Sequence, residues 1–239
     1  MHRNQKLVLL PGLLCDEAIW TPILEQLNVS DNYYIADYGE LEDLATMAKH
    51  VLTQVKDDQF ILFGHSMGGR IAMEIMRQAP ERVSRLGLFD TAYRSAASGE
   101  KGTQEKEKRM ALLEKSKQEG MRMMGKQWAL GMVHPQFHNT PVFDAILDML
   151  ARKTPAIFAA QINALLNRPD MESVLRQINC PTLLLCGEDD LWSPVSVHQE
   201  MQALINNATL SVIPSCAHMS TMEQPKSVAS AISKWLKES

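Results

Sequence analysis

The chain has 239 residues, of which 45% are hydrophobic and 22% charged, with a formal net charge of -4 and a pI near 6.0. This length accommodates one α/β domain with an insertion, and the slightly acidic balance argues against nucleic acid or an anionic membrane as a partner. The apolar stretch near the N-terminus, residues 7–10, is too short for a signal peptide, and no run approaches the roughly 18 apolar residues of a membrane span. We therefore expect a soluble, cytoplasmic protein.

The first part of the chain alternates apolar strands with amphipathic helices. Residues 6–10 and 33–36 have the pattern of core strands. Thr21 and Pro22 predict the start of a helix between them, with Thr21 as the N-cap and Pro22 in the first helical position. A stripe of apolar residues at helical spacing follows at 44–55. This alternation predicts parallel βαβ units with right-handed crossovers.

The most informative stretch begins at residues 60–63, an apolar run without alternation, and continues into Gly-x-Ser-x-Gly with Ser66 at its centre. Such a run is typical of a strand buried on both faces. An amphipathic helix pattern follows and ends before Pro80. A sharp turn between strand and helix lifts the hydroxyl of Ser66 above the sheet edge as a nucleophile. It also leaves the N–H of Met67 free to bind a developing oxyanion.

After a strand at 83–89, the character of the sequence changes, because helix patterns dominate and no strand-like run appears. Thr103 is a candidate cap for a charged helix that reaches about Gln118. We expect an inserted helical cap at residues 92–170, between two parts of an α/β core at 1–91 and 171–239. The next helix would present one apolar face, formed by Met121, Met124, Trp128 and Met132. Such a face is either an adaptable wall for a substrate or simply core, and helical spacing alone does not distinguish the two.

Two more strand patterns, at 181–186 and 210–213, precede an acidic cluster and His218, respectively. A serine hydroxyl needs a base with a pKa near 7, oriented by a carboxylate, to act as a nucleophile. Because the carboxyl ends of parallel strands open on one edge of the sheet, Ser66, the acidic cluster and His218 are expected to converge there. The loop after the first strand also ends at this edge, where the N–H of Leu13 is the candidate for a second oxyanion donor.

These motifs resemble those of cap-bearing, carboxylesterase-like serine hydrolases of the α/β-hydrolase fold. The matching segments are 9–16 for the oxyanion loop, 64–69 for the nucleophile turn, 187–194 for the acid turn and 216–218 for the base loop. This chain has Pro11-Gly12 where that family often has His-Gly. The resemblance implies a mostly parallel sheet flanked by helices, with an inserted helical cap.

The resemblance also implies a role for each site residue: Ser66 as nucleophile, His218 as base and then acid, Asp190 as the orienting carboxylate, and the N–H groups of Leu13 and Met67 as the oxyanion hole. Asp190 is preferred because it lies three residues after a glycine and four before a proline. Asp189, the neighbour of Asp190, remains an alternative for the acid. Asp90 is another, since some members of the fold carry the acid after the strand that follows the nucleophile helix.

The expected reaction is hydrolysis of a carboxylic ester or thioester with a small, mostly apolar acyl or alkyl group, through an acyl-enzyme and without a cofactor. Residues expected to contact the substrate are Met124, Trp128, Met132 and Met219. A lyase, a C–C bond hydrolase or a cofactor-free haloperoxidase is an alternative within the same fold, because fold and triad do not fix the reaction. A ligand-binding member without catalysis is a further alternative, although the intact motifs argue against it.

Other residues with chemical potential are expected to be structural. His134 and His138 have a spacing that suits a metal only on a helix, and Pro135 interrupts that helix, so no metal site is expected. The four cysteines show no Cys-x-x-Cys spacing and are expected to be reduced thiols. The sequence does not indicate an oligomeric state.

Overall fold

The computed structural model describes residues 5–29 and 31–238. Residues 1–4, which precede the apolar run at 7–10, therefore lie outside the described residues, and the run itself belongs to the first strand. Within the described ranges, no helix combines the length and apolar character that crossing a membrane requires.

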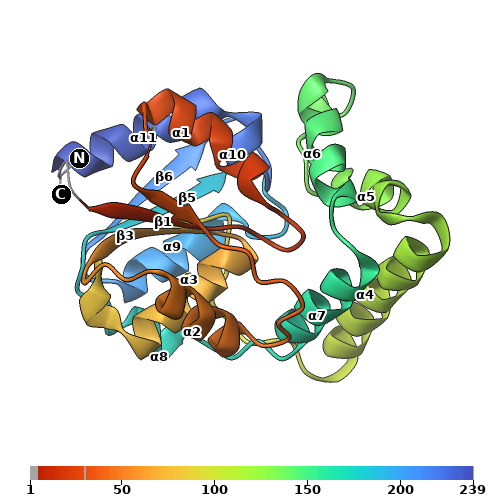
Figure 1. Cartoon of the computed structure of the whole chain (residues 1–239), viewed down its shortest axis with the longest axis horizontal. Coiled ribbons are helices and arrows are strands. Elements are labelled where there is room, and N and C mark those ends of the chain that lie inside the picture. The colour runs from red at the N-terminus through yellow and green to blue at the C-terminus, as the bar shows by residue number, and fades with distance from the viewer. Residues whose placement is uncertain (1–4, 30, 239) are drawn as a thin grey trace.

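Six parallel strands form one sheet in the order β2-β1-β3-β4-β5-β6 (Figure 1). The strands are β1 (Lys6–Leu10), β2 (Tyr33–Ile35), β3 (Phe60–His65), β4 (Val83–Phe89), β5 (Thr182–Gly187) and β6 (Ala208–Ile213). Every residue of β3 and β5 is buried, as their unbroken apolar sequences predict. The chain moves outward from β1 to β2 and then returns to β3 on the other side of β1. A crevice for ligands opens at such a reversal, outside the carboxyl ends of the strands.

Helices cover both faces of the sheet (Figure 1). On one face, α1 (Thr21–Leu27) packs against α11 (Pro225–Glu238), with the short α10 (Ser220–Glu223) beside them. The other face carries α2 (Leu44–Gln54), α3 (Met67–Gln78), α8 (Glu172–Leu175) and α9 (Val195–Leu204). Short 3₁₀ turns precede α1 and β4, at η1 (Glu17–Ile19) and η2 (Pro80–Arg82). The predicted parallel α/β core is confirmed.

The segment between β4 and α8 is helical apart from its loops and lies to one side of the sheet, at the right of Figure 1. Its elements are α4 (Gly99–Glu119), α5 (Met121–Ala129), η3 (Pro135–Phe137), α6 (Pro141–Ala151) and α7 (Pro155–Leu166). These helices pack mainly against one another, α4 on α5 and α7, and α5 on α6. Below we call α4 to α7 the cap helices.

Two predicted helix starts are wrong. α1 begins at Thr21 itself, with Trp20 as the N-cap, because η1 precedes it and the hydroxyl of Thr21 donates to the carbonyl of Glu17 instead. α4 begins four residues before Thr103, and the hydroxyl of Thr103 donates back to the Gly99 carbonyl within the first turn. The charged residues around Thr103 are as compatible with a helix as those after it, so their pattern does not mark the earlier start.

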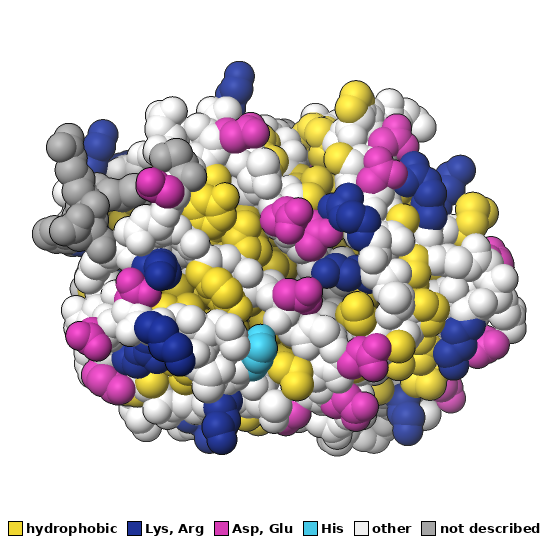
Figure 2. All heavy atoms as spheres, in the orientation of Figure 1, with side chains coloured by type: hydrophobic (Ala, Val, Ile, Leu, Met, Phe, Trp, Pro, Cys, Tyr) yellow, Lys and Arg dark blue, Asp and Glu magenta, His cyan; other side chains and the backbone are white. Residues whose placement is uncertain are grey.

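The surface in Figure 2 mixes basic and acidic side chains with hydrophobic ones. On this face, the described residues form no broad field of positive charge, in keeping with the formal net charge of -4. Long-range electrostatic attraction to a polyanion needs such a field.

Candidate active site

Ser66 lies in the sharp turn between β3 and α3, with φ 55° and ψ -116°, a backbone conformation that residues other than glycine rarely adopt. Two hydrogen bonds hold it there: its N–H donates to the carbonyl of Phe89 at 2.9 Å, and its carbonyl accepts from the hydroxyl of Thr91 at 2.7 Å. The turn also requires Gly68, because a Cβ at that position would lie 2.0 Å from the carbonyl oxygen of Leu10. Strain of this kind persists only where the surroundings fix it, and it is common at functional sites.

His218 lies between Ser66 and Asp190. Its Nε2 is 2.9 Å from the hydroxyl oxygen of Ser66, and its Nδ1 is 2.8 Å from Oδ2 of Asp190. The other oxygen of Asp190 accepts the N–H groups of Trp192 at 2.8 Å and Ser193 at 3.0 Å. Three loops that follow β3, β5 and β6 thus bring together the three residues that the motifs singled out.

The pKa values of this group shift in opposite directions. Burial by itself raises the pKa of Asp190, but the charge and hydrogen bond of His218, together with the two amide N–H groups, lower it overall. Burial by itself lowers the pKa of His218, but the charge and hydrogen bond of Asp190 raise it above 6.5. The pair therefore favours an ionised carboxylate beside an imidazole that readily accepts a proton.

The two alternative acids lie elsewhere. Asp189 is half exposed and faces His134, with Nε2 of His134 3.5 Å from its Oδ2. Asp90 is fully buried, accepts the N–H of Gly187 at 3.0 Å and contacts the hydroxyl of Ser220. Burial and the neighbouring Asp190 raise the pKa of Asp90 well above its usual range. Neither carboxylate is hydrogen-bonded to His218.

The loop after β1 lies against the turn that holds Ser66. A Cβ on Gly12 would be 2.9 Å from Nδ1 of His65 and 3.2 Å from Cβ of Ser66, so the loop passes as closely as glycine allows. Next to it, Leu13 lines the cavity with Met67, and no described residue accepts the Leu13 N–H. Met67 opens α3, where the first N–H groups have no partner within the helix. Both predicted oxyanion donors thus border Ser66.

Two buried side chains that the sequence reading missed fix the loops around Ser66. Gln161 of α7 accepts the N–H of Leu14 at 2.8 Å through Oε1. Glu223 of α10 accepts the N–H groups on either side of His218, from Ala217 at 2.9 Å and from Met219 at 3.0 Å. Gln161 is a polar side chain in a mostly apolar stretch, which is too common to be diagnostic, and Glu223 lies in a polar stretch that does not single it out.

A cavity of about 560 Å³ opens between the core and the cap helices, and Ser66, Leu13 and Met67 line it. Trp128, Met132 and Met219 also line it, as expected from the sequence. The expectation for Met124 is wrong: this residue is fully buried and does not line the cavity, because it lies where α5 packs against the neighbouring cap helices. The remaining apolar lining residues are Cys15, Ala92, Leu112, Phe158, Leu165 and Trp192.

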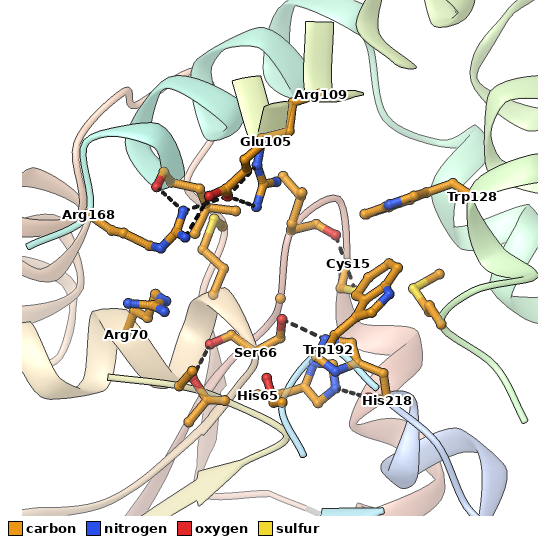
Figure 3. A pocket seen from close by; sticks show the side chains of 18 of the residues that line it. Cys15, His65, Ser66, Arg70, Glu105, Arg109, Trp128, Arg168, Trp192 and His218 are labelled. Atoms are coloured by element: carbon orange, nitrogen blue, oxygen red, sulfur yellow. Dashed lines mark hydrogen bonds and ion pairs between the residues drawn. The ribbon is translucent and has the colours of Figure 1, made fainter. Parts of the chain in front are cut away.

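Aromatic rings stand over the nucleophile. The indole of Trp192 lies 5.0 Å from the ring centre of His218 and 5.5 Å from that of Trp128 (Figure 3). The opposite wall is polar, with Arg70, Glu105, Arg109 and Arg168 facing the same space. The cavity therefore has one apolar wall and one polar wall, and only the apolar wall suits the mostly apolar substrate expected from the sequence.

The histidines and cysteines outside the triad have other surroundings. His65 is buried, its Nε2–H donates to the carbonyl of His218 at 2.8 Å, and burial lowers its pKa to about 3, so it is neutral. His138 contacts the carbonyl of Val133 at 2.8 Å through Nε2, on a different side from the Asp189 that His134 faces. All four cysteines are free thiols, and burial raises the pKa of Cys15 to about 12. A thiol with so high a pKa is a poor nucleophile.

Comparisons with known proteins agree with this geometry. The family model described as serine aminopeptidase, S33, matches residues 32–225. A pimeloyl-[acyl-carrier protein] methyl ester esterase of Nitrosomonas europaea is 23% identical over 234 residues, covering 94% of this chain and 92% of its own. A 2-succinyl-6-hydroxy-2,4-cyclohexadiene-1-carboxylate synthase of Enterobacter sp. is 25% identical over 252 residues, covering 97% and 91%. The structure of a thermophilic esterase from Thermogutta terrifontis aligns with a TM-score of 0.83 at 26% identity, covering 98% and 90%.

The matched family span includes the turn after β3 and the loops after β5 and β6, and the structural likeness extends over almost the whole chain. The resemblance recognised in the motifs is therefore confirmed. The chain is an α/β-hydrolase enzyme and belongs to the serine aminopeptidase S33 family.

Proposed function

We propose that this protein hydrolyses a carboxylic ester or thioester through an acyl-enzyme formed on Ser66. The observation that carries the proposal is the continuous pair of hydrogen bonds from Asp190 through His218 to the hydroxyl of Ser66, at 2.8 and 2.9 Å. These are the contacts by which a base removes the proton of a serine hydroxyl while a carboxylate stabilises the imidazolium that forms.

Each step has a residue in place for it. The oxygen of Ser66 attacks the carbonyl carbon as its proton passes to Nε2 of His218, and the negative oxygen of the tetrahedral intermediate accepts the N–H groups of Leu13 and Met67. His218 then gives the proton to the leaving alcohol or thiol, and the C–O or C–S bond breaks. A water molecule, deprotonated by His218, attacks the acyl-enzyme and releases the acid and Ser66.

The cavity between the core and the cap helices supports a substrate of modest size. Its volume of about 560 Å³ falls in the range of pockets that enclose small organic ligands. We propose that residues 92–170 act as the cap that closes this space, with Trp128 and Met132 as its apolar contacts to the substrate. Met219, from the loop that carries His218, is the core's contribution to the same wall.

Reaction with a fluorophosphonate probe, followed by peptide mass spectrometry, tests the proposal. Such probes label only a serine whose surroundings make it nucleophilic. We expect one adduct, on Ser66, and loss of both the adduct and ester hydrolysis in Ser66→Ala. Ser233→Ala, which changes a serine of α11 that does not line the cavity, is the matched control and should label like the wild type. Absence of an adduct on folded wild-type protein would contradict the proposal.

A lyase reaction is the alternative to keep, because one relative over nearly the whole chain is named as a synthase and the same three residues serve both chemistries. The two are separated by the products. Incorporation of ¹⁸O from labelled water into the released acid is expected for hydrolysis and not for elimination.

A further inference from the structure

The polar wall of the cavity is built from charges that do not balance. Glu105 of α4 is its only carboxylate among the lining residues described, and two arginines share it. Arg168 donates from Nη1 and Nη2 to the two oxygens of Glu105 at 2.7 and 2.8 Å, and Arg109 donates to Oε1 from Nε and Nη2 at 3.0 and 2.8 Å. One negative charge thus serves two positive ones. Two lysines, Lys101 and Lys108, also line this side.

Arg70 adds a third guanidinium with no carboxylate of its own. It lies on α3 and is only 8% exposed, and its one hydrogen bond within the described residues is from Nη1 to the carbonyl of Arg94 at 2.9 Å. Burial, and then the positive charge of Arg168, lower its pKa to about 9, which leaves it charged at neutral pH. Nearby, Nε of Arg168 is buried without a hydrogen-bond partner among the described residues.

A buried charge is costly unless it is paired, so a structural role explains Arg70 poorly. Packing alone would be served as well by methionine, and the carbonyl of Arg94 needs only one of its five N–H groups. Side chains that face a cavity with unused donors point to a ligand that completes them. The ligand that fits an excess of guanidinium groups is an anion.

Figure 3 shows where this anion would lie relative to the proposed reaction. Ser66 stands between Arg70 on one side and His218 with Trp192 on the other. The leaving group must lie near His218, since Nε2 protonates it. The acyl chain therefore extends the other way, toward Arg70.

We propose that Arg70 and the neighbouring Arg168 bind a carboxylate at the far end of the acyl chain, so that the preferred substrates are half-esters or half-thioesters of short dicarboxylic acids. This inference rests on the proposed function and deepens it. A guanidinium presents parallel N–H groups that match one carboxylate, and Arg70 has such a fork to spare. Arg70 follows Ser66 by four residues on α3, about one helical turn of 5.4 Å, so a short chain spans from the ester to the carboxylate.

The test compares two esters of equal chain length, mono-p-nitrophenyl glutarate and p-nitrophenyl pentanoate, which differ by the terminal carboxylate. We expect the wild type to favour the glutarate in kcat/KM by about tenfold or more, the effect of charge-assisted hydrogen bonds. Arg70→Met should abolish this preference, because it removes the charge and keeps a side chain of similar length. Arg176→Met, the same change at an exposed arginine just after α8 that does not line the cavity, is the matched control and should keep the preference.

A binding measurement separates this inference from the proposed reaction. Calorimetric titration of Ser66→Ala with monobenzyl glutarate and with benzyl pentanoate reports the carboxylate without turnover. We expect tighter binding of the glutarate by about tenfold or more, lost in Ser66→Ala/Arg70→Met. Equal binding of the two ligands would overturn the carboxylate site even if both nitrophenyl esters are hydrolysed. If Ser66→Ala bound the glutarate more tightly but the wild type hydrolysed neither nitrophenyl ester, the carboxylate site would stand and the proposed function would be overturned.

Discussion

At the scale of single residues, Asp190 differs from the two carboxylates near it by where its oxygens point. One oxygen faces Nδ1 of His218 and the other is held by the N–H groups of Trp192 and Ser193. The amide bonds fix the carboxylate, and the carboxylate fixes the imidazole toward Ser66. Asp189, one residue earlier, points to the surface and His134. Spacing in the sequence favoured Asp190 for the role of the acid, and this geometry supports that assignment.

Replacing Asp190 by asparagine should change both the rate and its pH dependence. Neutral His218 is the form that accepts the proton of Ser66, so activity falls as the pH drops through the pKa of His218. Asp190 raises that pKa above 6.5 in the wild type, while burial alone lowers it. In Asp190→Asn the acid limb of the kcat/KM profile for p-nitrophenyl pentanoate should therefore move to lower pH, with the plateau kcat reduced by about 10⁴.

Asp189→Asn is the control for that experiment, because it makes the same chemical change one residue away on an exposed side chain. Its profile should match that of the wild type in both plateau and acid limb. If Asp189→Asn lost activity and Asp190→Asn kept it, the assignment of the acid would be wrong.

At the scale of elements, the loop after β1 depends on a helix that lies more than a hundred residues further along the chain. Leu14 has a positive φ of 61°, and its N–H is satisfied by Gln161 of α7. This bond joins a cap helix to the loop that carries the Leu13 N–H. The loop that carries the proposed oxyanion donor is thus held from the cap side of the cavity.

Gln161→Leu should weaken transition-state stabilisation more than substrate binding. The variant removes the acceptor and leaves the buried N–H of Leu14 unpaired, so the loop is expected to shift. We expect kcat for p-nitrophenyl pentanoate to fall by about tenfold to hundredfold, with KM nearly unchanged. Deleting an oxyanion donor outright lowers kcat by about 10² to 10³, and a shifted loop should cost no more than the smaller of these values. Steady-state kinetics well below the melting temperature measures this.

Gln127→Leu, at an exposed position on the cap helix α5, is the matched control and should leave both constants as in the wild type. A rise in KM at constant kcat in Gln161→Leu would show that Gln161 serves the pocket rather than the oxyanion loop.

The elements differ in how well they could be predicted from the sequence. β3 and the turn at Ser66 were predictable, because an unbroken apolar run and two close-packed glycines leave few alternatives. The polar wall of the cavity was not predictable. Two of its residues, Glu105 and Arg109, lie on α4, which is charged on nearly every side, so that its periodicity marks no inward face. Met124 and Trp128 lie one turn apart on α5, yet one is in the core of the cap helices and the other lines the cavity. That difference is set by the neighbouring helices, which a single sequence does not position.

At the scale of the whole molecule, the proposed reaction divides between two parts of different construction. The core supplies Ser66, His218 and Asp190 from loops anchored on a sheet whose central strands are fully buried. The cap helices supply Trp128, Glu105 and Arg109, and they pack mainly on one another. Arg70 comes from α3 of the core, and Arg168 from the loop after α7. In the proposed reaction the core would hold the catalytic residues, and the cap helices would contact the variable portion of the substrate, as is usual for binding residues on a scaffold.

This construction predicts that the cap helices open locally before the core does. Regions with fewer buried contacts to the rest of the fold exchange their amide hydrogens through lower-energy openings.

One contact between the cap and the core is the ion pair of Arg152, after α6, with Asp16, in which Nε and Nη2 lie 2.8 and 2.9 Å from the two carboxylate oxygens. Hydrogen exchange followed by mass spectrometry should show faster exchange in α4 to α6 than in β3 and β5, and Arg152→Met should speed exchange in α6 while leaving β3 and β5 unchanged. Arg176→Met, which breaks the exposed ion pair with Glu172 at the end of α8, should leave α6 as in the wild type. Equal acceleration of α6 and β3 in Arg152→Met would instead mean that cap and core unfold as one cooperative unit, and the division at residues 92–170 would not hold.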